Sequence, residues 1–402
     1  MASMPATNPP RPKGTAGRIA LAVLLAMAML AMPWTTSVHA QPADAPLMQS
    51  ERGPLRVATV ASGLEFPWSL AFLPDGRMLV TERPGRLRVL GRDGAVDPRP
   101  VEGLPRAAVV GQGGLLDVVL HPQFAVNRWI YLSLAAGDAE GIGTEVVRGR
   151  LVVEQSGRMR LDDVQTVFRM APRSTRGQHF GSRLAFDAGG YLYITLGDRG
   201  EMQRAQRMDD HAGLVIRLHD DGRVPADNPF VKTAGARPEK FTLGNRNMQG
   251  AAIHPVTGEL WTHEHGPQGG DEVNVMRAGR NYGWPVITYG VNYGIGTRIG
   301  EGTARPGMEQ PLARWTPSIA PSGMAFYTGT AFPGWKGNLL VGALRGQALH
   351  RLELDGEKVV HEERLLQGMA RIRDVRVCPD GFVYLLTDER AGRLLRLEPG
   401  QR

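Results

Sequence analysis

The feature that most constrains the fold is a recurring unit of an apolar strand, a turn rich in Pro, Asp and Gly, and a second apolar strand. WSLAFLPDGRMLVTE and SRLAFDAGGYLYITLGD are two examples. The six copies begin at Trp68, Leu115, Ser182, Gln249, Ser322 and Arg373. Several are followed by further short strands such as GRLRVL and GRLLRLEP. One unit has too little apolar surface to be stable alone, so the repeats indicate stacked sheets. The sequence therefore predicts an all-β fold, a six-bladed β-propeller of four-stranded antiparallel blades.

The competing interpretation is an all-β sandwich with a second domain. The repeats extend to the C-terminus, which counts against it. The 51 Gly and 29 Pro among 402 residues suit many short strands joined by turns. The N-terminal strand-like segment at 55–64 is expected to complete the last blade, because closing the ring removes exposed edges.

Residues 1–40 are predicted to be a secretory signal peptide. Basic residues precede the apolar run Ile19–Met32, and the A-x-A-like sequence VHA at 38–40 precedes Gln41. The alternative is an uncleaved anchor, but a membrane-spanning helix needs about 20 apolar residues and this run is shorter. Residues 41–54 are expected to be a disordered lead-in, and 55–402 a single propeller domain that carries the activity.

Export and cysteine content together predict a periplasmic protein. The single cysteine, Cys378, excludes an intrachain disulfide and a cysteine-based zinc site. Cleavage removes three basic and no acidic residues, which lowers the formal charge of +7 to about +4. The remaining charges are interspersed, so we expect no nucleic-acid binding and no membrane span after cleavage.

One pair of residues is suited to proton transfer. In RGQHFGSRLAFDAGGYLYITLGDRG (176–200), His179 precedes one strand-like run and Asp198 follows the next. The intervening Ala-Gly-Gly is a hairpin signal, and a hairpin brings its two ends together. A histidine oriented by a carboxylate can act as a general base. Taken alone, a histidine before a strand is more often a hydrogen-bonded loop residue.

Polar residues recur where the first strand of a repeat begins. In a propeller these positions face the mouth of the central channel. They are Gln112, His179, Arg246, Asn247, Gln249, Arg345, Arg371 and Arg373. Arginines converging on one mouth repel one another unless an anion lies among them, and each planar fork matches a carboxylate. The set indicates a polyanionic small molecule, whereas any single arginine could simply bridge loops.

A glycine-rich segment, THEHGPQGGDEVN (262–274), carries a candidate metal site. Carboxylates at Glu264, Asp271 and Glu272 lie among glycines that expose backbone carbonyls, a donor set that suits Ca²⁺. Nearby histidines could suggest zinc, but no H-E-x-x-H spacing is present. The following NYGWP (281–285) is a rigid turn with aromatic walls, or a purely structural one.

Several enzyme classes are disfavoured by missing motifs. The sequence contains no G-x-S-x-G elbow, no P-loop and no G-x-G-x-x-G after a strand. A serine hydrolase, a nucleotide hydrolase and a Rossmann-type dehydrogenase are therefore not expected.

Six motifs, in order, resemble the bacterial soluble aldose sugar dehydrogenases, close kin of soluble quinoprotein glucose dehydrogenase. They are GQGGLLDVVL, HFGSRLAFD, LGNRNMQG, EHGPQGGDEVN, NYGWP and RIRDVR. The resemblance extends from about Gly63 to Pro399. Both groups use pyrroloquinoline quinone (PQQ) with Ca²⁺.

The resemblance implies a role for each matched residue. His179 matches the catalytic base and Asp198 the carboxylate that orients it. The positions that match the surroundings of the quinone are Gln112, Arg246, Asn247, Tyr293, Arg345, Arg371 and Arg373. Gly266 and Pro267 match the carbonyls that hold the active-site Ca²⁺. Glu272 and the carbonyl of Tyr282 match a second, structural Ca²⁺ site.

The implied reaction is oxidation of the C1 hydroxyl of an aldose to a lactone. The base removes the hydroxyl proton, hydride passes from C1 to the quinone, and Ca²⁺ polarises the quinone. Two positions depart from the pattern: relatives usually carry lysine at Arg345, and the glucose enzymes carry glutamine at His265. The implied partners are an aldose and an unidentified periplasmic or membrane electron acceptor, and the chain is expected to be a monomer.

Two other functions remain open at this point. A Ca²⁺-dependent propeller lactonase needs several metal-ligating carboxylates at the mouth and no arginine cluster. A non-catalytic propeller that binds sugars needs neither a base nor a cofactor.

Overall fold

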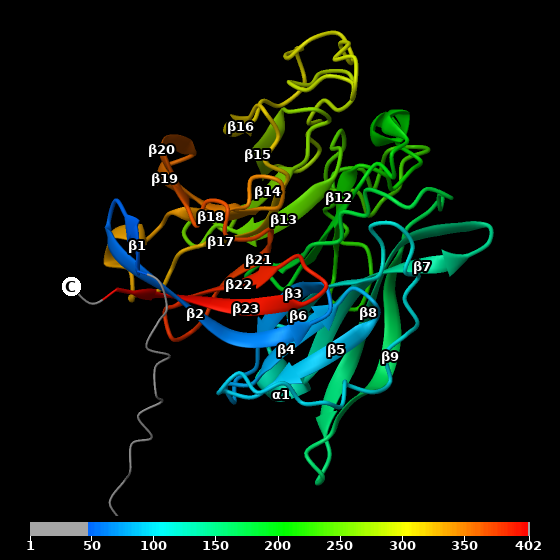
Figure 1. The fold of residues 1–402 in the computed structure, drawn as a ribbon. Coiled ribbons are helices and arrows are strands. Elements are labelled where there is room, and N and C mark those ends of the chain that lie inside the picture. Colours follow the sequence, from blue (N-terminus) through cyan, green and yellow to red (C-terminus); the bar gives the residue numbers. More distant parts are fainter. Residues whose placement is uncertain (1–46, 401–402) are drawn as a thin grey trace, which may run out of the picture. The chain divides into compact units, whose positions relative to one another are not determined.

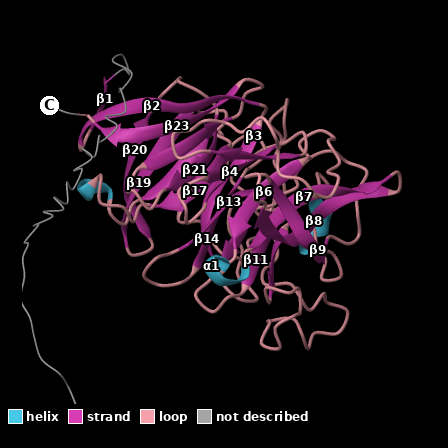
Figure 2. Ribbon diagram, turned by 90° about the horizontal axis from the view of Figure 1, so that it is seen from below, coloured by secondary structure: helices cyan, strands magenta, loops and turns pink. Residues whose placement is uncertain are grey.

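The computed structural model describes residues 47–400, so the predicted signal peptide and residues 41–46 lie outside the described residues. The described chain is built almost entirely of strands and loops (Figure 2). It forms six small antiparallel sheets, which we number as blades 1 to 6 (Figure 1). No helix between residues 47 and 400 is long and apolar enough to cross a membrane. The predicted six-bladed propeller is confirmed.

The strands follow the repeats along the chain. Blade 1 contains β3 (Pro67–Phe72), β4 (Met78–Glu82) and β5 (Arg86–Leu90). Blade 2 contains β6 (Leu115–Leu120), β7 (Trp129–Asp138), β8 (Gly141–Val153) and β9 (Met159–Arg169). Blade 3 contains β10 (Leu184–Phe186), β11 (Leu192–Leu196) and β12 (Leu214–Leu218). Blade 4 contains β13 (Met248–Ile253), β14 (Leu260–Glu264), β15 (Asp271–Met276) and β16 (Ala313–Trp315). Blade 5 contains β17 (Pro321–Phe326), β18 (Leu339–Ala343), β19 (Ala348–Asp355) and β20 (Lys358–Leu365). Blade 6 contains β21 (Ile372–Val377), β22 (Val383–Thr387), β23 (Gly392–Pro399), β2 (Gly53–Leu64) and β1 (Leu47–Ser50). The short helices are α1 (Phe124–Asn127), η1 (Met202–Gln206) and η2 (Pro333–Trp335).

Three blades correct the expectation of four strands: blade 6 has five, because β1 and β2 both join it, and two blades have three. Blades 1 and 3 have three strands each, and only isolated bridges, Leu90 with Val96 and Ile216 with Lys240, stand where a fourth would pair. The segments that follow β5 and β12, GRDGAVDPRPVEG and HDDGRVPADNPF, are rich in proline. Proline donates no hydrogen bond to a ladder, so these segments cannot extend the sheet.

The last blade closes the ring with the N-terminal strand, as predicted. β2 pairs antiparallel with β23 from Leu55 opposite Pro399 to Leu64 opposite Gly392, and the two strands lie side by side in blue and red (Figure 1). The disordered lead-in predicted for 41–54 is wrong over its second half. Leu47–Ser50 form β1, which pairs with the start of β2 and gives that edge a partner.

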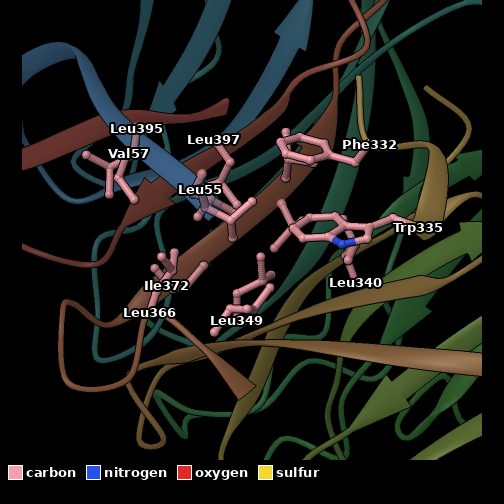
Figure 3. Packing of buried hydrophobic residues seen from close by; sticks show 14 of the residues in the cluster. Leu55, Val57, Phe332, Trp335, Leu340, Leu349, Leu366, Ile372, Leu395 and Leu397 are labelled. Atoms are coloured by element: carbon pink, nitrogen blue, oxygen red, sulfur yellow. The ribbon is translucent and has the colours of Figure 1, made fainter. Parts of the chain in front are cut away.

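Buried apolar clusters lie at the junctions between neighbouring blades. In the cluster between blades 5 and 6, Leu55 and Leu397 face Leu340, Leu349 and Trp335 (Figure 3). Equivalent clusters join the other five pairs of blades. Because each blade is covered on both faces, second strands such as β4 and β22 are buried at every position and do not alternate.

A charged network joins the inner strands at the centre of the ring. The carboxylate of Asp117 accepts hydrogen bonds from Ser69 Oγ (2.5 Å), Arg376 Nη2 (2.9 Å) and the Leu184 amide (2.8 Å). Arg183 Nη1 lies 2.9 Å from Asp374 Oδ1. These contacts join blades 1, 2, 3 and 6 across the axis.

Candidate active site

A cavity of about 300 Å³ opens at the end of the ring where the inner strands begin. Its size is at the lower end of that of small-molecule sites. Its lining residues precede inner strands, lie at the second position of an inner strand, or follow second strands: Trp68, Arg83, Gln112, Leu116, Phe180, Gly181, Asn247, Gln249, His265, Ala320, Leu344, Arg371, Arg373 and Asp388. The predicted convergence of Gln112, Asn247, Gln249, Arg371 and Arg373 on the mouth is confirmed.

His179 and Asp198 meet next to this cavity but do not line it; Phe180 and Gly181, which follow His179 in the chain, are part of its wall. The Nδ1 of His179 lies 2.6 Å from Oδ1 of Asp198, which is 1% exposed. Oδ1 also accepts the Gly200 amide (2.7 Å), and Oδ2 accepts the indole N–H of Trp284 (2.8 Å). An ionised carboxylate can only accept hydrogen bonds, so the contact with Oδ1 requires the proton of His179 to be on Nδ1. The Nε2 of His179, which has no hydrogen-bond partner among residues 47–400, is left as the basic nitrogen.

The glycines around Asp198 explain why the hairpin ends can approach so closely. A Cβ at Gly197 would lie 2.1 Å from the carbonyl oxygen of His179, and one at Gly200 would lie 2.2 Å from Gln178 Nε2. His179 itself has a left-handed backbone with φ +54°. This region is unfavourable for a residue other than glycine and is often found at functional sites.

The surroundings of His179 keep its ring neutral and Asp198 ionised. Burial lowers the pKa of His179, and the positive charges of Arg246 and Arg199 add to this, against the opposing effect of Asp198. For Asp198, burial favours a higher pKa, but the hydrogen bond from His179 and the positive charges nearby outweigh it and lower the pKa. A neutral imidazole beside a carboxylate is the protonation state that a general base requires.

Two of the predicted arginines share a carboxylate that the sequence reasoning did not single out. Arg371 Nη2 lies 2.9 Å and Arg373 Nη2 3.3 Å from the oxygens of Asp388. Arg373 Nη1 also donates to Gln249 Oε1 (3.1 Å). Asp388 directly follows β22, a position that resembles that of Asp198 after β11 and could have been noticed from the repeat.

Three predicted quinone contacts do not line the cavity: the exposed Tyr293 and Arg345, and the buried Arg246. Tyr293 lies in the loop after β15 and is 64% exposed, and Arg345 is exposed in the turn after β18; neither lines the cavity. In their place, Trp68 and Arg83 form part of the wall. Residues 293–298 of the loop that carries Tyr293 are all exposed, and Arg345 lies one residue beyond the lining Leu344.

Arg246 faces the metal loop and not the main cavity. It is buried, and its Nη1 donates to the carbonyl oxygens of His265 (3.1 Å) and Gly266 (3.0 Å). A carbonyl oxygen can accept this bond and still ligate a cation through its second lone pair. The carbonyls of Gly266 and Pro267 are therefore suitable Ca²⁺ donors, although the Gly266 carbonyl would be shared between the ion and the guanidinium of Arg246.

Glu272 faces a second carboxylate. It is the cross-strand partner of Glu264, and both line a small cavity with Tyr282. Burial raises the pKa of both carboxyls, and the charge of Glu264 adds to the effect at Glu272. Their side-chain partners are the amides of Asn245 and Asn274. Two adjacent carboxylates without an arginine or lysine side chain in hydrogen-bond contact form a donor set that suits Ca²⁺. No group of three or more His, Cys, Asp or Glu side chains suited to a metal occurs in residues 47–400, so carbonyls or water would have to complete it.

The cavity chemistry suits a flat anion. Trp68, Leu116 and Phe180 supply apolar walls, while Arg83, Arg371 and Arg373 supply positive charge. The Nε atoms of Arg83 and Arg373 are buried without an acceptor among the described residues. Unsatisfied cationic donors beside apolar walls favour a planar ligand with carboxylates.

A family model described as Glucose / Sorbosone dehydrogenase matches residues 64–396 of this chain. The chain is 46% identical over 350 residues to the aldose sugar dehydrogenase YliI of Escherichia coli (strain K12), which covers 86% of this chain and 93% of that protein.

Solved structures agree with this match. The apo-form of the soluble aldose sugar dehydrogenase of Escherichia coli has a TM-score of 0.81 at 43% identity and covers 86% of this chain and 100% of that one. The PQQ-bound aldose sugar dehydrogenase of Streptomyces coelicolor has a TM-score of 0.71 at 28% identity and covers 88% of this chain and 99% of that one.

Proposed function

This chain belongs to the glucose/sorbosone dehydrogenase family, and we propose that it is a periplasmic quinoprotein that oxidises the C1 hydroxyl of aldose sugars to lactones. The observation that carries the proposal is the His179–Asp198 pair, which adjoins a cavity with a cationic wall through the lining residues Gln112 and Phe180. A base beside an anion-binding cavity is what sugar oxidation by an anionic cofactor requires.

PQQ, which carries three carboxylates, is the cofactor that suits the cavity. Arg83, Arg371 and Arg373 would bind these carboxylates, and the amides of Gln112 and Asn247 would orient them. When bound, PQQ supplies the acceptor for the hydride that leaves C1 of the sugar.

His179 and Asp198 divide the work of proton transfer. Nε2 of His179 removes the proton of the C1 hydroxyl, and the positive charge that develops on the ring is stabilised by Asp198 at 2.6 Å. Gln112 Oε1 accepts the backbone N–H of His179 (2.8 Å), so a cofactor-binding side chain also anchors the base.

Calcium completes the proposal. The carbonyls of Gly266 and Pro267 would hold one ion near the cofactor, and Glu272 with the Tyr282 carbonyl would hold a structural one. Buried Glu264 lies opposite Glu272 and adds negative charge at that second place.

The test is reconstitution of the apo-protein with PQQ and Ca²⁺, followed by assay of a panel of aldoses with a dye acceptor. We expect dye reduction, and His179→Ala should nearly abolish turnover while PQQ still binds. No reduction with any aldose would refute the dehydrogenase, and full activity of the variant would remove the base assignment.

The lactonase alternative is less well supported by the lining of the cavity. Its one acidic residue, Asp388, is paired with two arginines and does not offer a free carboxylate cluster to a metal. A non-catalytic sugar-binding protein would not require a buried base with an oriented tautomer. The periplasmic location, the monomeric state and an external electron acceptor remain part of the proposal.

A further inference from the structure

Arg199 is a buried cation next to Asp198 in the chain. It is fully buried and forms no ion pair with any carboxylate of residues 47–400. Burial lowers its pKa to about 10, so it remains charged at neutral pH. Burying an arginine without a paired carboxylate is costly, and such a residue requires a compensating role.

The guanidinium of Arg199 holds the segment that leads into His179. Its Nη1 donates to the carbonyl of Gln178 (2.5 Å), and its Nη2 donates to the carbonyl of Arg176. Its plane lies over the ring of Phe180, 3.4 Å from the centroid. The contacts thus fall on both sides of His179 along the chain.

Both backbones are in the left-handed region. Arg199 has φ +59° and His179 has φ +54°. Such a conformation persists only where surrounding contacts fix it. At His179 those contacts are the Gln112 side chain on the amide and Arg199 on the preceding carbonyls. Asp198 orients the ring, and Arg199 fixes the backbone that carries the ring.

We infer that Arg199 is a positioning residue for His179, which holds the loop 176–180 so that the imidazole faces the sugar. The inference rests on the proposed function, because it presumes that His179 is the base. A misplacement of about 1 Å at a reacting group can lower a rate about a hundredfold.

The charge of Arg199 gives the inference a second, separable effect. The groups that act on His179 are Asp198, Arg246 and Arg199, with neutral His265 also nearby. Positive charge at Arg199 lowers the pKa of His179. Removal of that charge must raise this pKa, so the acid limb of the kcat profile must move to higher pH.

Two variants separate the two effects. R199K keeps the charge, but its ammonium cannot bind two carbonyls as a planar fork does. We expect kcat to fall at least tenfold with the acid limb unmoved. R199Q also removes the positive charge, so we expect the same loss of kcat and an acid limb of the kcat profile that lies at higher pH than in the wild type. R207Q, at an exposed arginine just after η1, is the control and should retain wild-type values.

The measurements are kcat, KM and the pH profile on the PQQ-loaded protein, with thermal melting to report folded protein. An NMR titration of His179 needs no turnover, so it tests the charge effect even if the wild type oxidises no aldose and the proposed function fails. Wild-type kcat in R199K, or an unmoved His179 pKa in R199Q, would overturn the inference. If R199Q does not fold, R199K alone decides: a kcat that falls only in proportion to the loss of folded protein also overturns it.

Discussion

Replacement of Asp198 by asparagine tests the tautomer of His179. Asp198 accepts from three donors: His179 Nδ1–H at 2.6 Å, the Gly200 amide at 2.7 Å and Trp284 Nε1–H at 2.8 Å. The amide of asparagine has only one oxygen. If its NH₂ faces Trp284, two donors oppose each other in a buried site. If its NH₂ faces His179, the ring must move its proton to Nε2 and present Nδ1 as the acceptor.

The second arrangement removes the lone pair that acts as the base. In serine proteases the equivalent Asp→Asn change produces the wrong tautomer and lowers kcat about ten-thousand-fold. Either arrangement leaves a buried donor without its acceptor, Trp284 Nε1–H in the first and the Gly200 amide in the second, which costs about 1–3 kcal/mol. We therefore expect Asp198→Asn to lower kcat about a thousand- to ten-thousand-fold, with little change in PQQ affinity.

The assay is steady-state turnover with saturating aldose and dye, together with PQQ binding followed by absorbance. The negative charge of Asp198 raises the pKa of His179. Loss of that charge lowers this pKa, so the acid limb of the kcat profile should also move to lower pH. Asp75→Asn, at a half-exposed turn carboxylate remote from the cavity, is the matched control. A kcat within tenfold of the wild type would refute the assignment of Asp198 as the group that fixes the tautomer.

Two further predictions concern stability. Asp117→Ala leaves Arg376 without one of its two carboxylate partners at the centre of the ring. Because removal of one member of a buried pair costs about 3–5 kcal/mol, the urea midpoint should fall well below that of the wild type. A loss of unfolding free energy under about 1 kcal/mol would contradict the role of the network. Chelation should lower the melting temperature, and added Ca²⁺ should restore it. At a Ca²⁺ concentration a hundred times the dissociation constant, the free energy of unfolding should rise by about 2.7 kcal/mol, whereas Glu272→Gln should respond weakly. A wild type whose melting temperature does not change with chelator would remove the calcium proposal.

The fold could be predicted because its determinants are local and repeated. Each copy contains its own turn, and β10 and β11 pair around Ala188 and Gly189 as the hairpin signal required. The same hairpin brought His179 to Asp198. The three-stranded blades could also have been anticipated from prolines such as Pro98 and Pro229, which prevent a fourth strand.

The rest of the site depends on contacts between distant segments. Trp284, which donates to Asp198, lies 86 residues further along the chain. No local pattern gives that distance, since it depends on how blade 4 packs against blade 3. Tyr293 is a different case: it matches a family position, but its side chain is exposed and does not line the cavity, so its contact with the quinone stays a prediction.

The arginine wall shows how a counterion and an anion site can coexist. Three guanidinium groups, those of Arg83, Arg371 and Arg373, line the cavity with one carboxylate, that of Asp388, so a net positive charge remains. Asp388 binds both Arg371 and Arg373, and their charges lower its pKa against the effect of burial, which keeps it ionised. The shared carboxylate also fixes the two forks relative to each other. Ordering a long side chain on binding costs about 0.5–1.5 kcal/mol, and these two are already ordered. Asp388 therefore cancels part of the attraction for an anion but reduces the cost of arranging the wall around it.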